Sequence, residues 1–406
     1  MPWIITITLL LFGLIALIYS YGIRRIVQAL AAVTSWPQSR IRFITIFIFS
    51  FLNLFPLVFL GAFLVWGRRI VPAFSGEVFL LDVVFVYPFW FCLVVMVQFI
   101  ALLFLMDLIR LVSYPVYRRT RLTWQVWQSR ITVGLLAALT IYSAVVIADD
   151  TWRVRIRETA VTLPEGAEGL RGLRIVHISD VQGDDRTTTG MLNAYVANVN
   201  ALNPDLVIFT GDLVTSGTSY IRSTAAILGK VEAKYRRVAV LGDHDYFSDK
   251  SRVVEALSRN GWEILQDSAA VVHVGDDSLC LTGITETYRK RVKLEELSGL
   301  LAQCHRIPFR IAIVHQPAEQ IVWAAEAAGY QLFLAGHTHG GGIAFGIPGI
   351  FLLAPARLES RFMSGFYHVG DLLVVVNNGI GLTLAPFRFH APAEITVLDL
   401  GSPVMR

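Results

Sequence analysis

Long apolar runs dominate the first 150 residues of the chain. Four of them are each about 18 residues or longer, the length that a helix needs to cross a bilayer. They cover residues 3–21, 43–66, 83–105 and 131–148. Buried helices of a soluble core would explain one such run. Four runs in succession instead predict a transmembrane region of four helices over residues 1–150.

The pattern changes after residue 172 to short apolar strands that alternate with helical stretches. Strands are expected at residues 173–178, 205–209, 238–241, 311–314 and 332–335, and helices at residues 188–202, 253–260 and 318–328. Periodicity alone predicts an α/β domain over residues 173–406. Residues 151–172, which include Pro164 and Gly166, are expected to be a linker between this domain and the membrane region.

Each of the five strands runs directly into acidic or histidine residues. The residues that follow the strands are Asp180 and Gln182, then Asp212, then Asp243 and His244, then His315, and finally His337 and His339. In open α/β sheets, ligands bind beyond the carboxyl ends of the strands. Several carboxylates gathered there would need a cation to hold them together. The sequence therefore predicts a metal site at this edge.

The five blocks resemble the motifs of the calcineurin-like metallophosphoesterases. In that family, D-x-H is followed along the chain by GD, GNH[D/E], H and GHxH. The corresponding segments here read SDVQ, TGDL, GDHD, HQP and GHTHG. The similarity covers residues 171–400 and is close to the membrane-associated bacterial and transmembrane branch of the family. It implies two sheets packed face to face with helices outside, an αββα sandwich.

The resemblance also implies a site for two metal ions. Asp180, Gln182, Asp212 and His339 would hold the first ion, and Asp243, His315 and His337 the second. Asp212 would bridge both ions. His244 would lie off the metals and act as the catalytic residue that faces the leaving group. A purely structural histidine in a turn, hydrogen-bonded to Asp245, is the alternative for His244.

Two positions depart from the family pattern. Gln182 stands where a histidine is usual, and Asp243 stands where an asparagine is usual. Gln182 replaces an imidazole nitrogen with an amide oxygen, and Asp243 replaces a neutral amide with a carboxylate. Together the two changes shift the site toward oxygen ligands, which suit Mn²⁺ or Mg²⁺ better than Zn²⁺. We expect two divalent ions, with Mn²⁺ favoured and Mg²⁺, Zn²⁺ or Fe left open.

These residues together predict a hydrolase, a dinuclear metallophosphoesterase anchored in the membrane. Two ions can clamp the attacking and leaving oxygens of an in-line displacement, and a metal-bridged hydroxide would attack the phosphorus. The substrate would be a phosphomonoester or a phosphodiester. The alternative is a non-catalytic membrane sensor that binds a metal or a phosphorylated ligand. Gln182 and Asp243 keep this alternative open.

Composition and charge locate the domain at a membrane and argue against nucleic acid. The chain is 54% hydrophobic and only 16% charged, whereas soluble proteins carry about 25% charged residues. Residues 1–150 hold 11 Lys and Arg against 5 Asp and Glu, and the remainder holds 24 against 26. The basic excess therefore belongs to the membrane region, where it suits contact with anionic lipid. No nucleic-acid partner is expected, and the oligomeric state stays open.

The distribution of arginine predicts the orientation. The loops after the first and third apolar runs are rich in arginine: Arg24, Arg25, Arg40 and Arg42 in one, and Arg110, Arg118, Arg119, Arg121 and Arg130 in the other. The loop after the second run sets Arg68 and Arg69 against Glu77 and Asp82. The positive-inside rule then places the catalytic domain outside the cytoplasmic membrane of a bacterium.

Two further features leave alternatives open. Residues 341–353 form a glycine-rich apolar segment directly after the last motif, and Phe345 and Ile350 lie in it. They would form an apolar wall for a lipid or other amphipathic phosphoester, or simply a packed loop. Cys280 and Cys304 are expected as a free buried pair by default, although an exported domain could join them.

Overall fold

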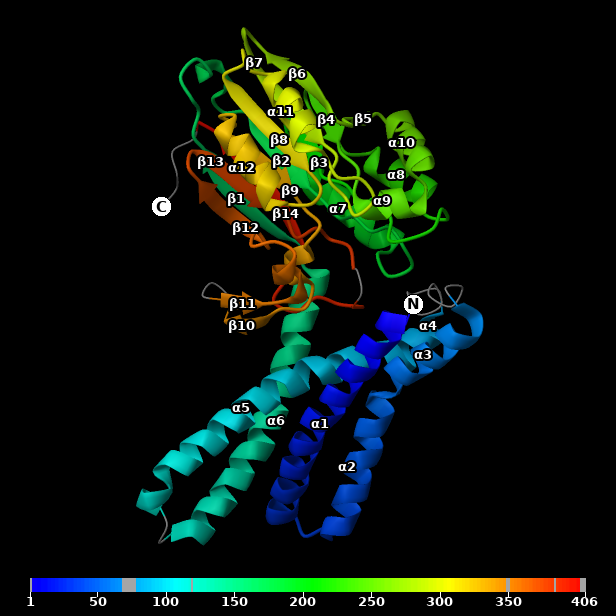
Figure 1. The fold of residues 1–406 in the computed structure, drawn as a ribbon, viewed down its shortest axis with the longest axis vertical. Helices are drawn as coiled ribbons and strands as arrows, with labels where there is room; N and C mark the ends of the chain where they lie inside the picture. The colour runs from blue at the N-terminus through cyan, green and yellow to red at the C-terminus, as the bar shows by residue number, and fades with distance from the viewer. Residues whose placement is uncertain (1, 68–77, 118–119, 348–350, 383–384, 402–406) are drawn as a thin grey trace. The chain divides into compact units, whose positions relative to one another are not determined.

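The chain folds as two compact units, which are described here separately. The computed structural model describes residues 2–67, 78–117, 120–347, 351–382 and 385–401. The first unit, Met1–Val146, is helical, and the second, Ile147–Arg406, combines helices and sheets. Figure 1 shows the helices of the first unit in blue to cyan and the sheets of the second in green to red.

The helical unit follows the apolar runs of the sequence. Its elements are α1 (Pro2–Val33), α2 (Gln38–Leu52), α3 (Leu54–Trp66), α4 (Phe79–Leu81), the π-helical turn η3 (Asp82–Val86), α5 (Tyr87–Tyr117) and most of α6 (Arg121–Trp152). Side chains such as Tyr19, Met96 and Phe99 form its buried core. Asp107 accepts a hydrogen bond from the Tyr21 hydroxyl at 2.6 Å and pairs with Arg25 at 3.1 Å.

Two helical stretches of this part are long and apolar enough to cross a membrane. They are Phe79–Pro115 and Thr123–Trp152, and the pair α2 and α3, bent by 42°, is a third candidate. The expected first span, residues 3–21, begins with side chains that lie outside the described residues, as do Arg68, Arg69, Glu77, Arg118 and Arg119. The described residues therefore support two or three of the four expected spans.

The second unit contains two six-stranded sheets. The first has the order β1 (Arg155–Val161), β14 (Glu394–Leu400), β2 (Arg174–Ile178), β3 (Leu206–Phe209), β4 (Arg236–Ala239) and β5 (Glu263–Ile264). The second has the order β12 (Gly365–Val369), β13 (Leu372–Val376), β9 (Leu332–Ala335), β8 (Phe309–Val314), β7 (Asp277–Ile284) and β6 (Ser268–Val274). In both sheets the central strands are parallel. The short strands β10 (Phe345–Ile347) and β11 (Phe351–Leu353) pair apart from these sheets.

Helices cover the outer face of each sheet (Figure 1). The helices α7 (Thr189–Ala201), α8 (Ile221–Leu228) and α10 (Lys250–Arg259) pack on the first sheet, and α11 (Leu294–Ala302) and α12 (Glu319–Ala327) pack on the second. A short helix, α9 (Asp243–Ser248), follows β4. This arrangement confirms the expected αββα sandwich.

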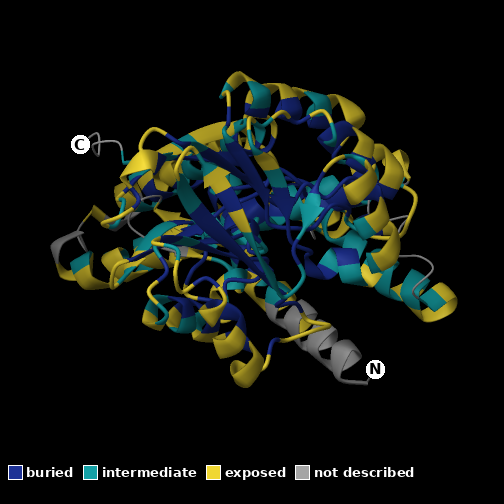
Figure 2. Cartoon of the chain, turned by 90° about the horizontal axis from the view of Figure 1, so that it is seen from above, coloured by how far each residue is buried: buried dark blue, intermediate teal, exposed yellow. Residues whose placement is uncertain are grey.

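Alternation along the strands explains why their sequences are almost wholly apolar. On β8, Ile311 and Ile313 point between the two sheets, whereas Ala312 and Val314 face the helices. Both faces of a central strand are therefore buried, as parallel sheets covered on both sides require. Figure 2 shows most of the central strands in dark blue and much of the surrounding helices in yellow.

Two features differ from the sequence-based expectations. The segment expected as a linker, residues 151–172, contains β1, which pairs in parallel with β14 over residues 155–161. Cys280 on β7 and Cys304 after α11 form a disulfide with a Cα–Cα distance of 6.1 Å. The default expectation of two free thiols was therefore wrong.

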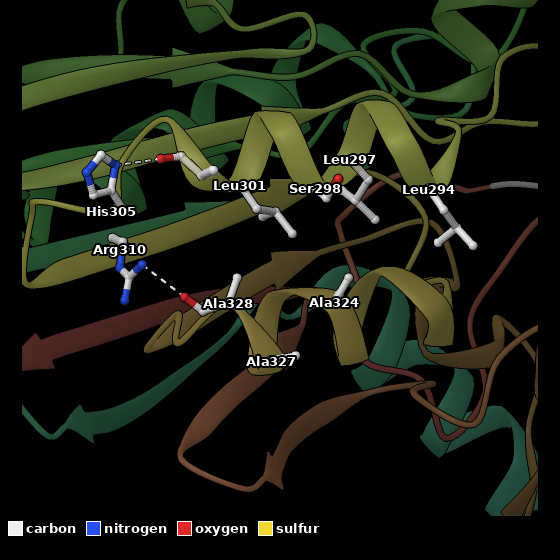
Figure 3. Close-up of a pocket in the computed structure, with 10 residues that line it drawn as sticks. Leu294, Leu297, Ser298, Leu301, His305, Arg310, Ala324, Ala327 and Ala328 are labelled. Carbon is white, nitrogen blue, oxygen red and sulfur yellow. Dashed lines mark hydrogen bonds between the residues drawn. The ribbon is translucent and has the colours of Figure 1, made fainter.

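A shallow groove lies between α11 and α12 (Figure 3). Its walls are mainly apolar, with Leu297 and Leu301 on one side and Ala324 and Ala328 on the other. Arg310 donates a hydrogen bond from its guanidinium to the Ala328 carbonyl at 2.9 Å. The described residues that line this groove include none of the expected metal ligands.

Candidate metal centre

The parallel strands bring all the expected site residues to one edge of the unit. Asp180 follows β2, Asp212 follows β3, and Asp243 begins α9 just after β4. On the second sheet, His315 follows β8 directly, and one residue separates His337 from the end of β9. Because the carboxyl ends of parallel strands meet at one edge, these side chains converge although up to 157 positions separate them in sequence.

Most of these residues have an unusual backbone conformation. Among the described residues, eight other than glycine have a positive φ, and five of them are expected metal ligands. Those five are Asp180, Gln182, Asp212, His337 and His339, with φ between 46° and 71°. Such conformations cost about 1–3 kcal/mol each and cluster at functional sites. The fold thus holds strained turns at the place where the sequence predicts metal ions.

Two glycines allow the turns to approach each other. A Cβ atom at Gly336 would lie 1.8 Å from the Ser179 hydroxyl oxygen, and one at Gly242 would lie 2.1 Å from Asp212 Oδ1. No real Cβ atom tolerates such contacts. The glycines of the GHTHG and GDHD segments therefore leave space for the carboxylates behind them.

The residues expected to hold the second ion form one compact group. Ligand atoms of Asp243, His315 and His337 all lie within 4.8 Å of one another. His315 Nε2 is 3.0 Å from Asp243 Oδ1, and His337 Nδ1 is 3.1 Å from the same oxygen. One carboxylate oxygen therefore faces two imidazole nitrogens, as around a shared cation.

The residues expected to hold the first ion lie beside this group. Ligand atoms of Asp180, Asp212 and His315 again fall within 4.8 Å of one another. His339 Nε2 is 3.3 Å from Asp180 Oδ1, and Gln182 Nε2 donates a hydrogen bond to Asp212 Oδ2 at 2.8 Å. His315 therefore contacts both halves of the site, because its Nε2 is also 3.3 Å from Asp212 Oδ2.

Two buried oxygens in this half lack a hydrogen-bond partner. Asp180 Oδ1 and Gln182 Oε1 are fully buried and accept no hydrogen bond within the described part of the chain. Leaving buried acceptors unpaired costs about 1–3 kcal/mol each. Both are oxygen atoms that a hard divalent cation prefers. The residues present therefore fit the ions that the motifs imply.

The electrostatics of the site also indicate a missing positive charge. Burial, and then the charge of Asp212, raises the pKa of Asp180 above its usual value. Burial opposes the charge of His315, yet the carboxylates of Asp212 and Asp243 raise its pKa well above the ordinary value. Divalent ions bound among these carboxylates would supply the positive charge that the raised pKa values of Asp180 and His315 favour.

His244 lies at the start of α9 next to both halves. One of its ring nitrogens lies within 4.8 Å of carboxylate oxygens of Asp212 and Asp243. Its Nδ1 donates a hydrogen bond to the Thr215 carbonyl, so Nε2 is the ring nitrogen that remains for another partner. Burial opposes its charge, but Asp212 and Asp243 raise its pKa.

Within the described part of the chain, the Asp245 carboxylate makes no hydrogen bond with the His244 ring. It instead accepts hydrogen bonds from the backbone N–H groups of Asp212, Leu213 and Gly242, at 2.9–3.0 Å. Burial, and then the charge of Asp212, raises the pKa of Asp245 to about 7. Asp245 therefore ties the GD turn to the GDHD turn.

Three residues near the site were missed in the sequence. Glu359 Oε2 is 3.0 Å from His337 Nε2 and accepts a hydrogen bond from the Tyr288 hydroxyl at 2.6 Å. Arg388 is 1% exposed and donates to the carbonyls of His339, Asn378, Gly381 and Ala391. None of the three belongs to a recognisable motif. Only their distance in space, not their sequence context, connects them with the histidines.

The apolar segment after GHTHG is partly packed and partly exposed. The Phe345 ring lies 6.0 Å from the Phe389 ring, so this residue packs against the domain. Ile347 and Leu353, on the paired strands β10 and β11, are 52% and 63% exposed. Ile350 lies outside the described residues. The segment is thus neither a fully packed loop nor a wall built from Phe345.

Comparison with known proteins agrees with this geometry. Residues 173–341 match the family model of the calcineurin-like phosphoesterases. The chain is 29% identical over 246 residues to an uncharacterized metallophosphoesterase, YkuE, of Bacillus subtilis, which covers 58% of this chain and 81% of that protein. It is 30% identical over 282 residues to a zebrafish (Danio rerio) transmembrane protein with metallophosphoesterase domain, which covers 67% of this chain. The matched region spans 62% of the zebrafish protein.

Solved structures with lower identity align with about half of the chain. A 5′-nucleotidase precursor from Thermus thermophilus aligns over 52% of this chain and 49% of its own, with 17% identity and a TM-score of 0.36. A dimetal phosphatase from Danio rerio aligns over 56% of this chain and 99% of its own, with 14% identity and a TM-score of 0.34. The family match over residues 173–341 and the sequence relatives place this chain in the calcineurin-like metallophosphoesterase family.

Proposed function

We propose that this chain is a membrane-anchored, metal-dependent phosphoesterase that hydrolyses phosphomonoesters or phosphodiesters. The observation that carries the proposal is the convergence of the expected ligands around two buried oxygens. Gln182 Oε1 accepts no hydrogen bond among the described residues, and Asp180 Oδ1 lies 3.3 Å from His339 Nε2 but also accepts none. A structural cluster without a cation would leave these buried oxygens without a hydrogen bond. It would also leave the charge of the buried Asp180 carboxylate, whose pKa is raised, unbalanced.

Two sets of residues would hold the ions. Asp180, Gln182, Asp212 and His339 would bind one, and Asp243, His315 and His337 the other, with Asp212 shared between them. When bound, two divalent ions would activate water and neutralise charge on the phosphoryl oxygens. The oxygen-rich ligand set favours Mn²⁺, with Mg²⁺, Zn²⁺ or Fe as alternatives.

His244 would deliver a proton to the leaving oxygen. The hydrogen bond to the Thr215 carbonyl fixes its Nδ1 as the donor nitrogen and frees Nε2 for the substrate. Asp212 and Asp243 raise its pKa despite burial, which favours the protonated imidazole needed for this step. General acid catalysis of this kind contributes about 10²–10⁴ in rate.

Two observations support an orientation with the catalytic unit outside the cytoplasm. The arginine-rich loops point to the cytoplasmic side by the positive-inside rule. The Cys280–Cys304 disulfide is stable in oxidising compartments such as the periplasm and is rare in the cytosol. We therefore propose an extracytoplasmic phosphoesterase in a bacterial cytoplasmic membrane.

An amphipathic substrate fits the exposed apolar side chains beyond the site. Ile347, Leu353 and Leu358 are 52%, 63% and 92% exposed, in a segment that follows the GHTHG turn. Apolar side chains exposed together favour contact with a membrane surface or an acyl chain. A lipid phosphoester is accordingly the proposed substrate class.

Hydrolysis by the purified full-length protein tests the activity. A chromogenic phosphodiester and the matching monoester would be assayed after the metals are removed, with Mn²⁺, Mg²⁺ or Zn²⁺ restored separately. We expect turnover that depends on metal, falls sharply in Asp212→Asn and falls about 10²–10⁴-fold in His244→Ala. Turnover without metal, or unaffected by either substitution, would refute the proposal.

A second candidate function is a non-catalytic sensor that binds a metal or a phosphorylated ligand. One observation favours it: the Gln182 amide N–H occupies Asp212 Oδ2, an oxygen that a bridging role would need. Metal binding by folded protein without turnover of either ester would establish the sensor. Restoration of turnover by Gln182→His would then identify the glutamine as the cause.

A further inference from the structure

A cavity of about 490 Å³ lies next to His337. Among its described lining residues, His337 is the one expected metal ligand. His337 and Thr338 form one wall, and Tyr288, Gln316, Trp323 and Glu359 belong to the others. His337 is therefore shared between the metal site and the cavity. A phosphoester whose phosphorus lies at the metals could extend its alcohol portion into this space.

We propose that this cavity, the alcohol subsite, binds the leaving group of the substrate and selects a hydroxyl-bearing alcohol without negative charge. The inference rests on the proposed phosphoesterase function and deepens it by naming the class of leaving group. Four features of the described residues carry it: an unpaired amide, two aromatic rings, an excess of carboxylates and fixed walls.

The unpaired amide belongs to Gln316. Its side chain is 8% exposed, and its Nε2 has no hydrogen-bond partner within the described residues. Burying an amide N–H without an acceptor is costly, so a ligand oxygen at this place would be favoured. Gln316 also follows His315 directly in the chain and lines the same cavity as His337.

Aromatic rings form another part of the wall. Trp323 and Tyr288 are each 50% exposed although both rings line the cavity. The Tyr288 ring packs edge-on against His337 at 5.4 Å between centroids. Half-exposed aromatic faces beside hydrogen-bonding groups suit the C–H face and the hydroxyl edge of a polyol or sugar.

The charge of the walls disfavours an anionic leaving group. The cavity is lined by the carboxylates of Glu286, Glu319 and Glu359 and by one guanidinium, that of Arg291. Arg291 already faces Glu286 at 3.9 Å. A carboxylate or a second phosphate on the leaving group would therefore meet a net negative surface, whereas hydroxyls can donate to the carboxylates.

The walls are held in place before any ligand arrives. Ser360 donates a hydrogen bond from its hydroxyl to the Pro317 carbonyl at 2.7 Å, and Thr338 donates to the Met363 carbonyl at 2.6 Å. Tyr288 is fixed by its hydrogen bond to Glu359. A preformed cavity binds with little loss of side-chain freedom.

Three esters that differ in the charge of the alcohol test the inference. Full-length, Mn²⁺-loaded protein would be assayed with glycerol 3-phosphate, 3-phosphoglycerate and phosphocholine, and with their methyl diesters. The alcohols are neutral, anionic and cationic in turn. We expect a higher kcat/KM for the glycerol and choline esters than for the glycerate ester.

Two variants connect the preference with the cavity. Gln316→Leu removes the amide at similar volume and is expected to lower kcat/KM for the glycerol ester by about 2- to 10-fold, the effect of one hydrogen bond. Trp323→Leu removes a half-exposed aromatic ring that lines the cavity, and is expected to narrow the preference for glycerol over glycerate. Gln303→Leu, an exposed glutamine at the end of α11, is the matched control and should change neither quantity.

The outcomes separate the inference from the proposed function. Metal-dependent turnover with the glycerate ester preferred, or with a preference unchanged in both variants, would overturn the alcohol subsite alone. Absence of metal-dependent turnover of every ester, including a chromogenic diester, would overturn the phosphoesterase proposal and the subsite with it.

Discussion

At the scale of single residues, the site depends on groups that hold the histidines in the correct orientation. Glu359 accepts or shares a proton with His337 Nε2, while His337 Nδ1 faces Asp243. Histidines that bind a metal usually donate their other ring N–H to a carboxylate or carbonyl, which fixes the ring and its tautomer. Arg388 donates a hydrogen bond from its guanidinium to the His339 backbone carbonyl at 3.3 Å, which likewise restrains that histidine.

Glu359→Gln is predicted to weaken metal binding without unfolding the protein. Because the carboxylate no longer fixes the His337 tautomer, affinity for Mn²⁺ should fall about 10- to 100-fold. Calorimetric titration of metal-free protein measures this directly. Glu295→Gln, on the exposed side of α11, is the control. Equal affinities of wild type and Glu359→Gln would show that Glu359 has no positioning role.

Metal affinity is predicted to rise with pH. In the metal-free protein, burial opposes the charge of His337, but hydrogen bonds with Asp243 and Glu359 raise its pKa to about 9. A metal must displace that proton, so affinity should increase by up to about 10-fold per pH unit for each proton released. Titrations with Mn²⁺ between about pH 6 and pH 8 test this, and a flat profile would contradict it.

The same shift has the opposite consequence for the metal-free fold. Because the pKa of His337 is raised from 6.5 to about 9, its contribution to stability is complete at pH below 6.5. This contribution is lost as the pH rises through about 9. Metal-free protein should therefore lose stability over the range in which metal affinity grows.

At the scale of secondary-structure elements, the strand ends were predictable and their surroundings were not. The five central strands carry a local signal, because apolar residues buried on both faces run directly into Asp or His. The predicted helices at residues 188–202, 253–260 and 318–328 correspond to α7, α10 and α12. The strand ends could therefore be aligned with the family motifs.

Other elements lack such a signal. β1 carries Arg155, Arg157 and Glu158 and is largely exposed, so its sequence does not look like a strand, and its partner β14 lies more than 200 residues away. Tyr288 and Glu359 meet His337 only through the tertiary fold. A single sequence contains no pattern that brings these segments together.

Gly336→Ala is predicted to be strongly destabilising, in contrast to an ordinary helix glycine. The added methyl group would fall 1.8 Å from Ser179 Oγ and 2.3 Å from Asp180 Oδ2, so the turns after β9 and β2 must separate. Overpacking of this kind costs about 1–3 kcal/mol or more. Thermal unfolding of the full chain in detergent should show a clear decrease in the melting temperature.

Gly299→Ala provides the matched control for this prediction. Gly299 lies inside α11, with nothing within 4 Å of the new Cβ. Alanine there should stabilise the helix by about 0.5–1 kcal/mol. A Gly336→Ala protein as stable as Gly299→Ala would refute the close packing of the two turns.

At the scale of the whole molecule, the disulfide and the apolar helices support a catalytic unit exported to the outside of a membrane. Cys280 and Cys304 are joined, and Cys92 is free and buried in the helical unit. Disulfides persist where the compartment is oxidising. The state of the cysteines in cells therefore reports the side of the membrane on which the unit lies.

Thiol labelling of protein taken directly from cells is predicted to show one reactive cysteine after denaturation. Cys92 should react without a reductant, and Cys280 and Cys304 only after reduction. A Cys280→Ala variant is the control, since it should release the Cys304 thiol. Three reactive cysteines without a reductant would place the unit in a reducing compartment and contradict the proposed orientation.

The proposed site holds two metal ions that act together on a phosphoester. The most direct measurement is turnover of a chromogenic phosphoester as metal-free, full-length protein is titrated with Mn²⁺. We expect negligible turnover with one ion per chain and a plateau when two are bound, with Asp212→Asn inactive throughout. A plateau at one ion per chain, or no turnover from folded protein that binds two ions, would contradict it.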